Sequence, residues 1–356
     1  MNVSATHEPI GFAEVAEFHV EVARRFDLSL GSAPVVVGGD PAKRGKVVAA
    51  SRDLRGLGIV DGMGVAEVLD RVPDARWVRT DLPRAREFAG VLRAAIRAEI
   101  EALEVEGLAG FYMRAPRNPD EAFEWAKRLE ARVFERTKLP LRAGVAPARF
   151  AARLAAEDAG WSGVRIIAEG DFEAYLMAQS VARLPGVGPK TAARLAELGA
   201  ADVPGLRKLG LERLDVLLGN HGRTLWQLAA GEDPKPLRVR RHPASLSREE
   251  TLNGEGGDRT TLEAAIARLS EGLESALSRD GLLAGRIALR LKGPGERTLT
   301  RSTSLGDPTA AATALAEVGR DLLGRIEVEG HVFRRVGLVL KGLEATGASD
   351  RQLDLF

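Results

Sequence analysis

The stretch Leu184–Gly199, LPGVGPKTAARLAELG, predicts a helix, a tight glycine turn and a second helix. Pro189 is typical of a first helical position, because its fixed φ suits the first turn and its missing N–H would have no partner there. Four apolar residues then fall on one face of the second helix: Ala192, Leu195, Ala196 and Leu198. We therefore expect a helical domain around this stretch, continued by Leu206–Ala230.

The glycine turn also predicts a phosphate-binding site. Two glycines let backbone N–H groups approach an anion closely, and the positive end of the following helix favours negative charge. The expected contacts are Gly186, Gly188, Lys190 and Thr191. The natural anion is a DNA phosphate, and such a turn would hold DNA without reading its sequence. The alternative interpretation is a plain helical hairpin.

The composition indicates a cytoplasmic protein of two or three domains. The chain has 356 residues, no cysteine and five scattered histidines, which excludes disulfides and thiolate metal sites and leaves no zinc spacing. No apolar run approaches about 18 residues, and Met1–Ile10 lacks the features of a signal peptide, so no membrane contact is expected. The formal net charge is only +1, so any nucleic-acid surface must come from local basic clusters.

The N-terminal half alternates between predicted strands and helices. Ala33–Gly39, APVVVGG, reads as a buried strand that ends in a glycine turn. Val47–Asp61 predicts a small helix that carries Arg52 and Arg55. The further expected elements are a helix at Val65–Leu69, a strand at Arg76–Arg79, a helix at Arg84–Ala102, a strand at Leu103–Arg114, a helix at Asp120–Thr137, a strand at Leu141–Val145, and a strand end that leads into a helix at Gly144–Glu157.

The C-terminal part begins with a basic linker, Lys235–His242, KPLRVRRH. An extended tether of this kind could follow a phosphate backbone through Arg238, Arg240 and Arg241, or it could be a solvated linker. From Ala244 the predicted order is strand, helix, two strands, helix and strand. That order is the ferredoxin-like split repeat.

These segments together resemble the Y-family translesion DNA polymerases. The resemblance is carried by PVVVGG with VVAASRDLRGLGIVDGM and VPDARWVRTD, by GVAPARFAARLAAE, by the helix-hairpin-helix motif of the glycine turn, and by SLSREETL with RRVGLVLKGLE. It implies an α+β right-hand polymerase fold with palm, fingers, helical thumb and ferredoxin-like little finger. The implied bounds are 1–38 and 77–167 for the palm, 39–76 for the fingers, 168–232 for the thumb, 233–243 for the linker, 244–344 for the little finger and 345–356 for a tail.

The resemblance also implies a nucleotide site in the fingers. In this family the fingers hold the triphosphate of the incoming nucleotide through a tyrosine and, three residues later, an arginine. Here Arg52 stands at the tyrosine position and Arg55 at the arginine position. Both side chains could instead lie on a solvated helix face.

The metal site is where this chain departs from the family pattern. Polymerase chemistry in the family needs two divalent cations about 4 Å apart, held by carboxylates. Counting back from PVVV puts the first catalytic strand on Glu14–Ala23, with Glu14 at the first aspartate. Matching GFYMRA to the family's AFLDLT puts Leu108 and Ala109 where an Asp-Glu pair should be. A single carboxylate cannot hold two hydrated Mg²⁺ ions, so no metal or other cofactor is expected, and Glu14 and Glu17 are expected to be solvated.

Backbone contacts and a clamp-binding tail complete the implied sites. On the little-finger sheet the candidates for phosphate contacts are Ser247, Arg248, Arg297 and Arg301. The end of the chain, RQLDLF, is similar to the pentapeptide by which bacterial replication and repair proteins bind the sliding clamp. Its candidate contacts are Gln352, Leu353, Asp354, Leu355 and Phe356.

Three functions are open at this point. Degenerate members of the superfamily act as polymerase-like subunits of a bacterial mutasome, which implies a non-catalytic, clamp-tethered, DNA-binding factor in damage tolerance. Its partners would be primer-template or damaged DNA, the sliding clamp, a recombinase-like protein and a replicative-type polymerase. The alternative is an active error-prone polymerase that binds Mg²⁺ through Glu14 with Glu104 or Glu106, after a slip in strand register. The third is a purely structural protein without DNA affinity.

Overall fold

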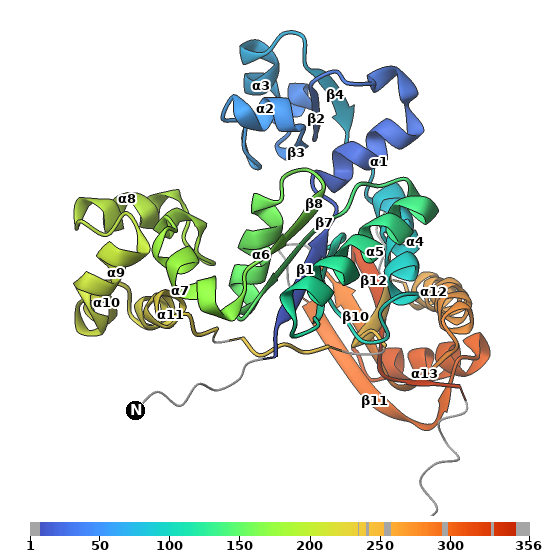
Figure 1. Ribbon diagram of the computed structural model, residues 1–356. Coiled ribbons are helices and arrows are strands. Elements are labelled where there is room, and N and C mark those ends of the chain that lie inside the picture. The colour runs from blue at the N-terminus through green and yellow to red at the C-terminus, as the bar shows by residue number, and fades with distance from the viewer. Residues whose placement is uncertain are drawn as a thin grey trace, which may run out of the picture. The chain divides into compact units, whose positions relative to one another are not determined.

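The computed structural model describes residues 8–233, 235–239, 242–252, 258–293, 298–328 and 331–346. The chain divides into two compact units, Met1–Val239 and Arg240–Phe356, and each is described by itself (Figure 1). Within the described ranges, no helix combines the length and the apolar character needed to cross a membrane.

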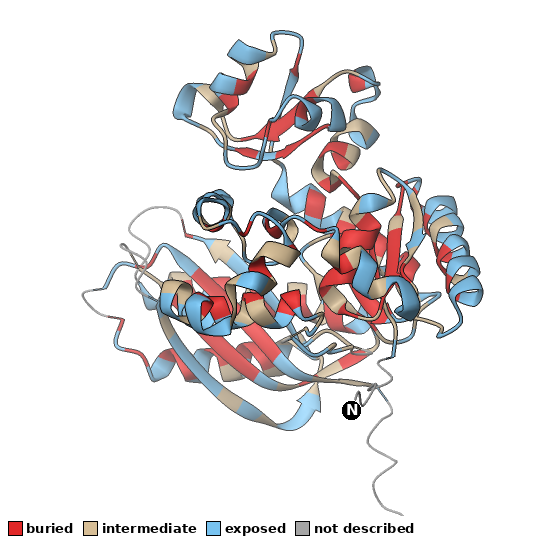
Figure 2. Ribbon diagram, turned by 60° about the vertical axis from the view of Figure 1, so that its left-hand side comes forward, coloured by how far each residue is buried: buried red, intermediate tan, exposed pale blue. Residues whose placement is uncertain are grey.

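The palm is a five-stranded sheet in the order β5-β6-β1-β7-β8. Its strands are β1 (Ile10–Glu14), β5 (Glu104–Glu106), β6 (Gly110–Arg114), β7 (Arg142–Ala146) and β8 (Gly163–Ile166). Strand β1 is central and pairs antiparallel with both β6 and β7. Because its residues are apolar on both faces, the sheet is covered on both sides. Figure 2 shows the buried residues following these strands.

Different helices cover the two faces of the palm sheet (Figure 1). Helices α4 (Leu82–Arg97) and α5 (Pro119–Thr137) pack on the face of Phe111 and Met113. Helix α6 (Arg149–Asp158) packs on the face of Phe12 and Tyr112. The sheet therefore has an α4/α5 face and an α6 face.

Helix α6 lies very close to β7, because the sequence supplies small residues at the contact. A Cβ atom on Gly144 would come within 2.2 Å of the carbonyl oxygen of Ala152 and 2.3 Å of the backbone nitrogen of Ala156. Both alanines are fully buried. The segment GVAPARFAARLAAE thus fixes how closely α6 approaches the sheet, and with it the height of the α6 side chains above the sheet.

The fingers have a separate three-stranded sheet in the order β3-β2-β4. It consists of β2 (Val35–Gly38), β3 (Val47–Ala50) and β4 (Arg76–Arg79), with α2 (Arg52–Gly56) and α3 (Val65–Arg71). The sequence-based bounds put β2 and most of β4 in the palm. In the structure β2 pairs with β3 and β4 and not with the five-stranded sheet.

The thumb is helical and shares a core with α6. Its helices are α7 (Glu169–Met177), α8 (Pro189–Glu197), α9 (Val203–Leu209), α10 (Leu211–Leu218) and α11 (Asn220–Ala229). Leu195, Leu206 and Leu225 are buried in this core together with Leu154 of α6. The predicted helical domain is therefore present.

The second unit is a four-stranded antiparallel sheet with two helices on one face (Figure 1). Its elements are β9 (Ser245–Thr251), α12 (Arg259–Arg279), β10 (Leu282–Lys292), β11 (Thr298–Thr309), α13 (Ala312–Gly324) and β12 (Arg335–Ala345). The order of the elements along the chain is that of the split βαββαβ repeat, as predicted. The strand order β11-β10-β12-β9 puts the second and fourth strands in the centre of the sheet, whereas the ferredoxin-like fold has its first and third strands there.

Three local predictions are wrong. The strand expected at Glu14–Ala23 ends at Glu14, because Glu17 adopts a left-handed backbone (φ 55°) and α1 (Phe18–Phe26) begins directly after it. The single strand expected at Leu103–Arg114 is the hairpin of β5 and β6, which turns at Gly107 (φ 63°). The helix expected at 47–61 is β3 followed by the short helix α2.

The close approach of α6 to β7 generates a prediction about two glycines. Gly144→Ala should lower the free energy of unfolding by at least about 2 kcal/mol, because the new methyl group must displace backbone atoms of α6. The control is Gly90→Ala in α4, where an added Cβ meets nothing within 4 Å. This change should raise stability by about 0.5–1 kcal/mol, since alanine favours a helix interior. Urea denaturation measures both, and equal effects would contradict the described packing.

Candidate functional site

One row of side chains crosses the palm sheet beneath α6. Glu106 on β5 lies opposite Gly110 on β6, which in turn lies opposite Glu14 on β1. On its other side Glu14 lies opposite Arg142 on β7. Residues that oppose each other across an antiparallel pair lie on the same face of the sheet. Because Glu14 is two residues from Phe12, this is the α6 face.

Glu14 and Arg142 form the central ion pair of this row. Oε1 of Glu14 accepts hydrogen bonds from Nε and Nη2 of Arg142 at 3.0 and 2.5 Å. Nη1 of Arg142 donates to the carbonyl oxygen of Gly160 at 3.1 Å. The side chains of Glu14 and Arg142 are only 17% and 19% exposed. Glu14 is therefore not the solvated residue that the sequence predicted, but half of a largely buried ion pair.

Two further arginines reach down from α6 to the acids of β5. Arg149 donates from Nη1 to Oε1 of Glu104 at 2.7 Å and from Nη2 to Oε2 of Glu106 at 3.2 Å. Arg153 donates from Nη1 to Oε1 of Glu106 at 2.7 Å. The guanidinium carbon of Arg149 also lies 3.8 Å from the centre of the Tyr112 ring. We name these residues the palm ion-pair lattice: Glu14, Glu104, Glu106, Arg142, Arg149 and Arg153.

The pKa of Glu104 reflects the strength of this lattice. Burial by itself would raise the pKa, but hydrogen bonds from the Arg149 guanidinium and from the backbone N–H of Arg238 outweigh it, so the pKa lies below its ordinary value. For Arg149, burial alone would lower the pKa, and the hydrogen bond to Glu104 and the nearby acids raise it instead. Both partners therefore stay charged at neutral pH.

The two positions of the family's Asp-Glu pair lie in the turn between β5 and β6. The backbone N–H of Val15 donates to the carbonyl oxygen of Ala109 at 3.2 Å, which places Ala109 beside the end of β1. The side chain of Ala109 is buried in the core on the α4/α5 face, and Leu108 packs against the same core. The side chains of Leu108 and Ala109 thus add apolar contacts and no carboxylate.

A pair of Mg²⁺ ions does not fit this arrangement of residues. Mg²⁺ takes oxygen ligands, and two ions need several carboxylate oxygens between them. The three glutamates of the lattice already pair with arginines, and the alternative set of Glu14 with Glu104 or Glu106 would have to release them. In the part of the chain that the structure describes, no three His, Asp or Glu side chains converge to hold a metal ion.

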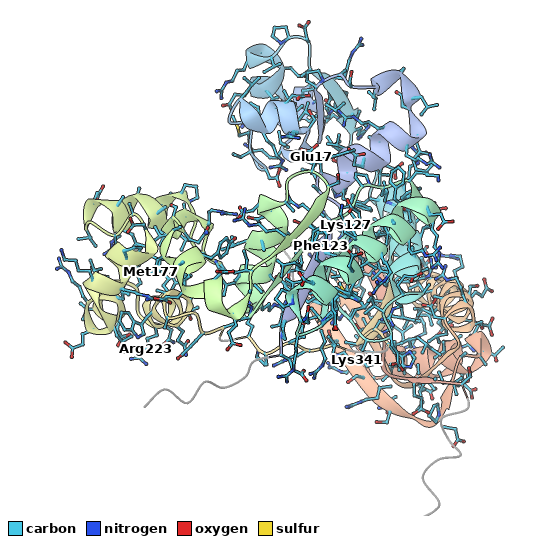
Figure 3. The ribbon with its side chains drawn as sticks, viewed as in Figure 1. Glu17, Phe123, Lys127, Met177, Arg223 and Lys341 are labelled. Atoms are coloured by element: carbon cyan, nitrogen blue, oxygen red, sulfur yellow. The ribbon has the colours of Figure 1, made fainter. Side chains whose placement is uncertain are left out.

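The two arginines at the predicted nucleotide site both lie close to acids of the chain itself. Arg55 donates from Nη2 to Oδ1 of Asp61 at 2.9 Å and from Nε to the carbonyl oxygen of Ala50 at 3.2 Å. The backbone N–H of Arg52 hydrogen-bonds to the carboxylate of Glu17. Glu17, labelled in Figure 3, comes from the turn between β1 and α1. A triphosphate at this place would compete with Asp61 for Arg55.

Glu17 is half-buried, contrary to the solvated position predicted for it. Burial raises the pKa of Glu17, although the Arg52 N–H and the charge of Arg55 act in the opposite direction. Burial also lowers the pKa of His19, which Asp61 partly opposes. Glu17, in the turn that follows β1 of the palm, thus lies next to Arg52 of the fingers in a partly buried position.

The glycine turn of the thumb has the geometry of an anion site. Gly186 has φ 85°, which favours glycine, and Gly188 is the N-cap of α8 with no side-chain cap on the first N–H groups. Lys190 is exposed and Thr191 is half-buried in the first turn of α8. The element before the turn is a single 3-10 turn, Val181–Arg183, and not the predicted helix, because Pro185 follows too soon after α7.

The open face of the second unit carries basic residues that the sequence analysis did not single out. Arg335 on β12 lies opposite Lys292 on β10, and Lys341, labelled in Figure 3, lies opposite Arg286. Both rows lie on the face away from α12 and α13. The exposed basic residues of this face are Arg286, Arg290, Arg335 and Lys341, with Lys292 half-buried. Glu249 lies on the same face, over Gly337.

Two of the predicted phosphate contacts lie on the other face of this sheet. Arg248 opposes the buried Leu338 and packs over Gly272 of α12. Arg301 opposes the buried Leu289. Ser247, by contrast, opposes Val339 and lies on the open face. Alternation in the sequence IALRLK could have identified Arg290 and Lys292, because they alternate with buried residues of β10.

Several predicted contacts lie outside the described residues. They are Arg240, Arg241, Arg297 and the tail residues Gln352, Leu353, Asp354, Leu355 and Phe356. Arg238 is described, and its side chain is exposed while its backbone N–H is bound to Glu104 at 2.7 Å.

Comparisons with known proteins agree with this fold. Residues 14–157 match the impB/mucB/samB family, and residues 243–355 match the impB/mucB/samB family C-terminal domain. A DNA polymerase IV from Halorhodospira halophila is 33% identical over 95% of this chain and 95% of its own length. A DNA polymerase IV from Alkalilimnicola ehrlichii is 31% identical over 95% of this chain and 96% of its own length.

Solved structures share the fold at lower identity. DinB from Sulfolobus solfataricus aligns with a TM-score of 0.74 at 20% identity, over 94% of this chain and 98% of that chain. An insertion ternary complex of Dbh DNA polymerase aligns with a TM-score of 0.73 at 20% identity, over the same shares. The chain therefore belongs to the impB/mucB/samB family and has the fold of the Y-family DNA polymerases.

Proposed function

We propose that this protein is a Y-family polymerase homologue that binds DNA but does not synthesise it, and that it acts in damage tolerance while tethered to the sliding clamp. The observation that carries the proposal is the palm ion-pair lattice. Arg142 neutralises Glu14, and the positions of the family's Asp-Glu pair are the apolar residues Leu108 and Ala109. Arginine guanidinium groups thus neutralise the carboxylates on the α6 face of the palm sheet. DNA synthesis would require two metal ions at these carboxylates.

Binding to duplex DNA is supported by two separate surfaces. The thumb offers uncapped N–H groups of α8 with Lys190, which suits one phosphate. The second unit offers a sheet face with Arg286, Arg290 and Arg335, which suits a run of phosphates. Both surfaces would contact the backbone and not base edges, so binding would depend little on sequence and strongly on salt.

Tethering to the clamp rests on the sequence of the tail. Gln352, Leu353, Leu355 and Phe356 present one amide and three apolar groups behind a spacer of small residues. Such a segment suits a pocket on a partner. Through the clamp, the protein would reach damaged primer-template DNA in the cytoplasm together with a recombinase-like protein and a replicative-type polymerase.

The second candidate function is an active translesion DNA polymerase with a rearranged metal site. The observation in its favour is that relatives about one-third identical over nearly the whole chain are named DNA polymerase IV. For this function, Glu14 and the acids of β5 would have to release Arg142, Arg149 and Arg153 and bind metal ions instead.

A primer-extension assay separates the two candidates. The purified chain with primer-template DNA, nucleotides and Mg²⁺ or Mn²⁺ should add no nucleotide above background, because no described set of carboxylates can hold two metal ions. A competent Y-family polymerase serves as positive control. Robust incorporation that Glu14→Ala abolishes would establish the second candidate and overturn the first.

Gly188→Ala tests the thumb turn without disturbing the fold. An added Cβ at Gly188 meets nothing within 4 Å, and its φ is −86°, so the thermal midpoint should change little. The methyl group would nevertheless lie where a phosphate approaches the N–H groups of α8, and affinity for duplex DNA should fall about three- to tenfold. Gly170→Ala in α7, equally open, is the matched control. Unchanged duplex affinity in Gly188→Ala would argue for a plain helical hairpin.

Removal of the tail tests the tether. A chain that ends at Arg351 should bind a bacterial sliding clamp at least about tenfold more weakly, because the apolar groups that enter the pocket are gone. Its affinity for duplex DNA should stay the same. Ser349→Ala, in the spacer, is the control. Clamp binding that survives the truncation would place the clamp contact elsewhere in the chain.

A further inference from the structure

The first residues of the linker between the two units are bound to the palm. Oδ2 of Asp233 accepts a hydrogen bond from the backbone N–H of Phe150 at 3.0 Å, and Oδ1 accepts one from the N–H of Lys235 at 2.8 Å. Phe150 lies in the first turn of α6, whose N-cap residue is Ala148 and has no side chain able to cap. Asp233 therefore supplies the cap of α6 from 83 residues further along the chain.

A second anchor lies five residues beyond Asp233. The backbone N–H of Arg238 donates to Oε2 of Glu104 at 2.7 Å, while Oε1 of the same carboxylate accepts from Arg149 at 2.7 Å. Between the two anchors Leu237 is half-buried and packs against the core that the palm shares with the thumb. One polar cap, one apolar contact and one charge-assisted hydrogen bond thus hold this short segment.

We propose that residues 233 and 235–239 form a strap, bound to the palm through Asp233, Leu237 and Glu104, that sets how far the second unit can move from the first. This inference does not depend on whether the protein synthesises DNA. The sequence pattern predicted the linker to be extended and basic. The structure shows its first half bound to the palm, with Leu237 against the core and the side chains of Lys235 and Arg238 exposed.

The length of free chain explains why the strap matters. Strand β9 begins at Ser245. From Asp233 a fully extended tether to Ser245 would span about 40 Å, and from Val239 about 20 Å. Halving the length of the free tether raises the effective concentration of the second unit around the first by about threefold or more.

Glu104 gives this strap a connection to the lattice. Its carboxylate is shared between Arg149 and the linker N–H, so the ion pair orients the oxygen that holds Arg238. Glu106 lies on the same strand and face and pairs with the same Arg149, but it forms no hydrogen bond with the described residues of the linker. The two acids therefore form a matched pair for a test.

The test compares Glu104→Ala with Glu106→Ala in the full chain. Hydrogen–deuterium exchange of residues 237–239 should become at least about tenfold faster in Glu104→Ala and stay unchanged in Glu106→Ala. Because the chain has no native cysteine, dyes can be placed at Ala131→Cys on α5 and Ser278→Cys on α12. The distribution of dye distances should broaden in Glu104→Ala alone.

Two outcomes would overturn the proposal. One is unchanged exchange of residues 237–239 in Glu104→Ala. The other is equal acceleration in both variants, which would mean that loss of the lattice and not of the anchor releases the linker. If Glu104→Ala lowers the thermal midpoint, Leu237→Ala tests the strap by a change in the linker and not in the palm. It should also accelerate exchange and broaden the dye distances, and failure to do either would equally contradict a strap.

Discussion

The ion pair between Glu14 and Arg142 is the interaction on which the rest of the palm depends. It joins the central strand β1 to β7 on the face that α6 covers, and it lies beside the acids of β5 that Arg149 and Arg153 contact. Loss of one partner in a buried pair leaves an uncompensated charge, which typically costs about 3–5 kcal/mol. A metal ion at Glu14 would compete with Arg142 for this carboxylate.

The fingers also hold an ion pair at the position where the sequence predicted a nucleotide site. Arg55, at the position that holds a triphosphate in the resembled family, pairs with Asp61, and Glu17 hydrogen-bonds the N–H of Arg52. In both places a carboxylate of the chain meets an arginine that could otherwise bind an outside group. The two sites thus support one interpretation, in which the palm and fingers keep their fold without the ligands of synthesis.

Periodicity and turn residues were enough to predict helices α4, α5 and α6, the glycine turn of the thumb and the split repeat of the second unit. They could not predict the partner of Glu14, because Arg142 is 128 residues away and only strand pairing brings the two together. For the same reason the sequence could not predict that Asp233, 83 residues after Phe150, caps α6. No face could be predicted for Arg248 from the sequence, because the alternation of β9, where most residues are exposed, is weak, whereas that of β10 points to Arg290 on the open face.

The occupancy of the palm by metal ions tests this account most directly. Crystals of the chain with duplex DNA and a non-hydrolysable nucleotide, grown in Mn²⁺, would show each bound ion as a peak in the anomalous difference map. The account predicts no peak within coordination distance of Glu14 and an intact Glu14–Arg142 pair. Two peaks about 4 Å apart beside Glu14, with Arg142 turned away, would contradict it and would support an active DNA polymerase.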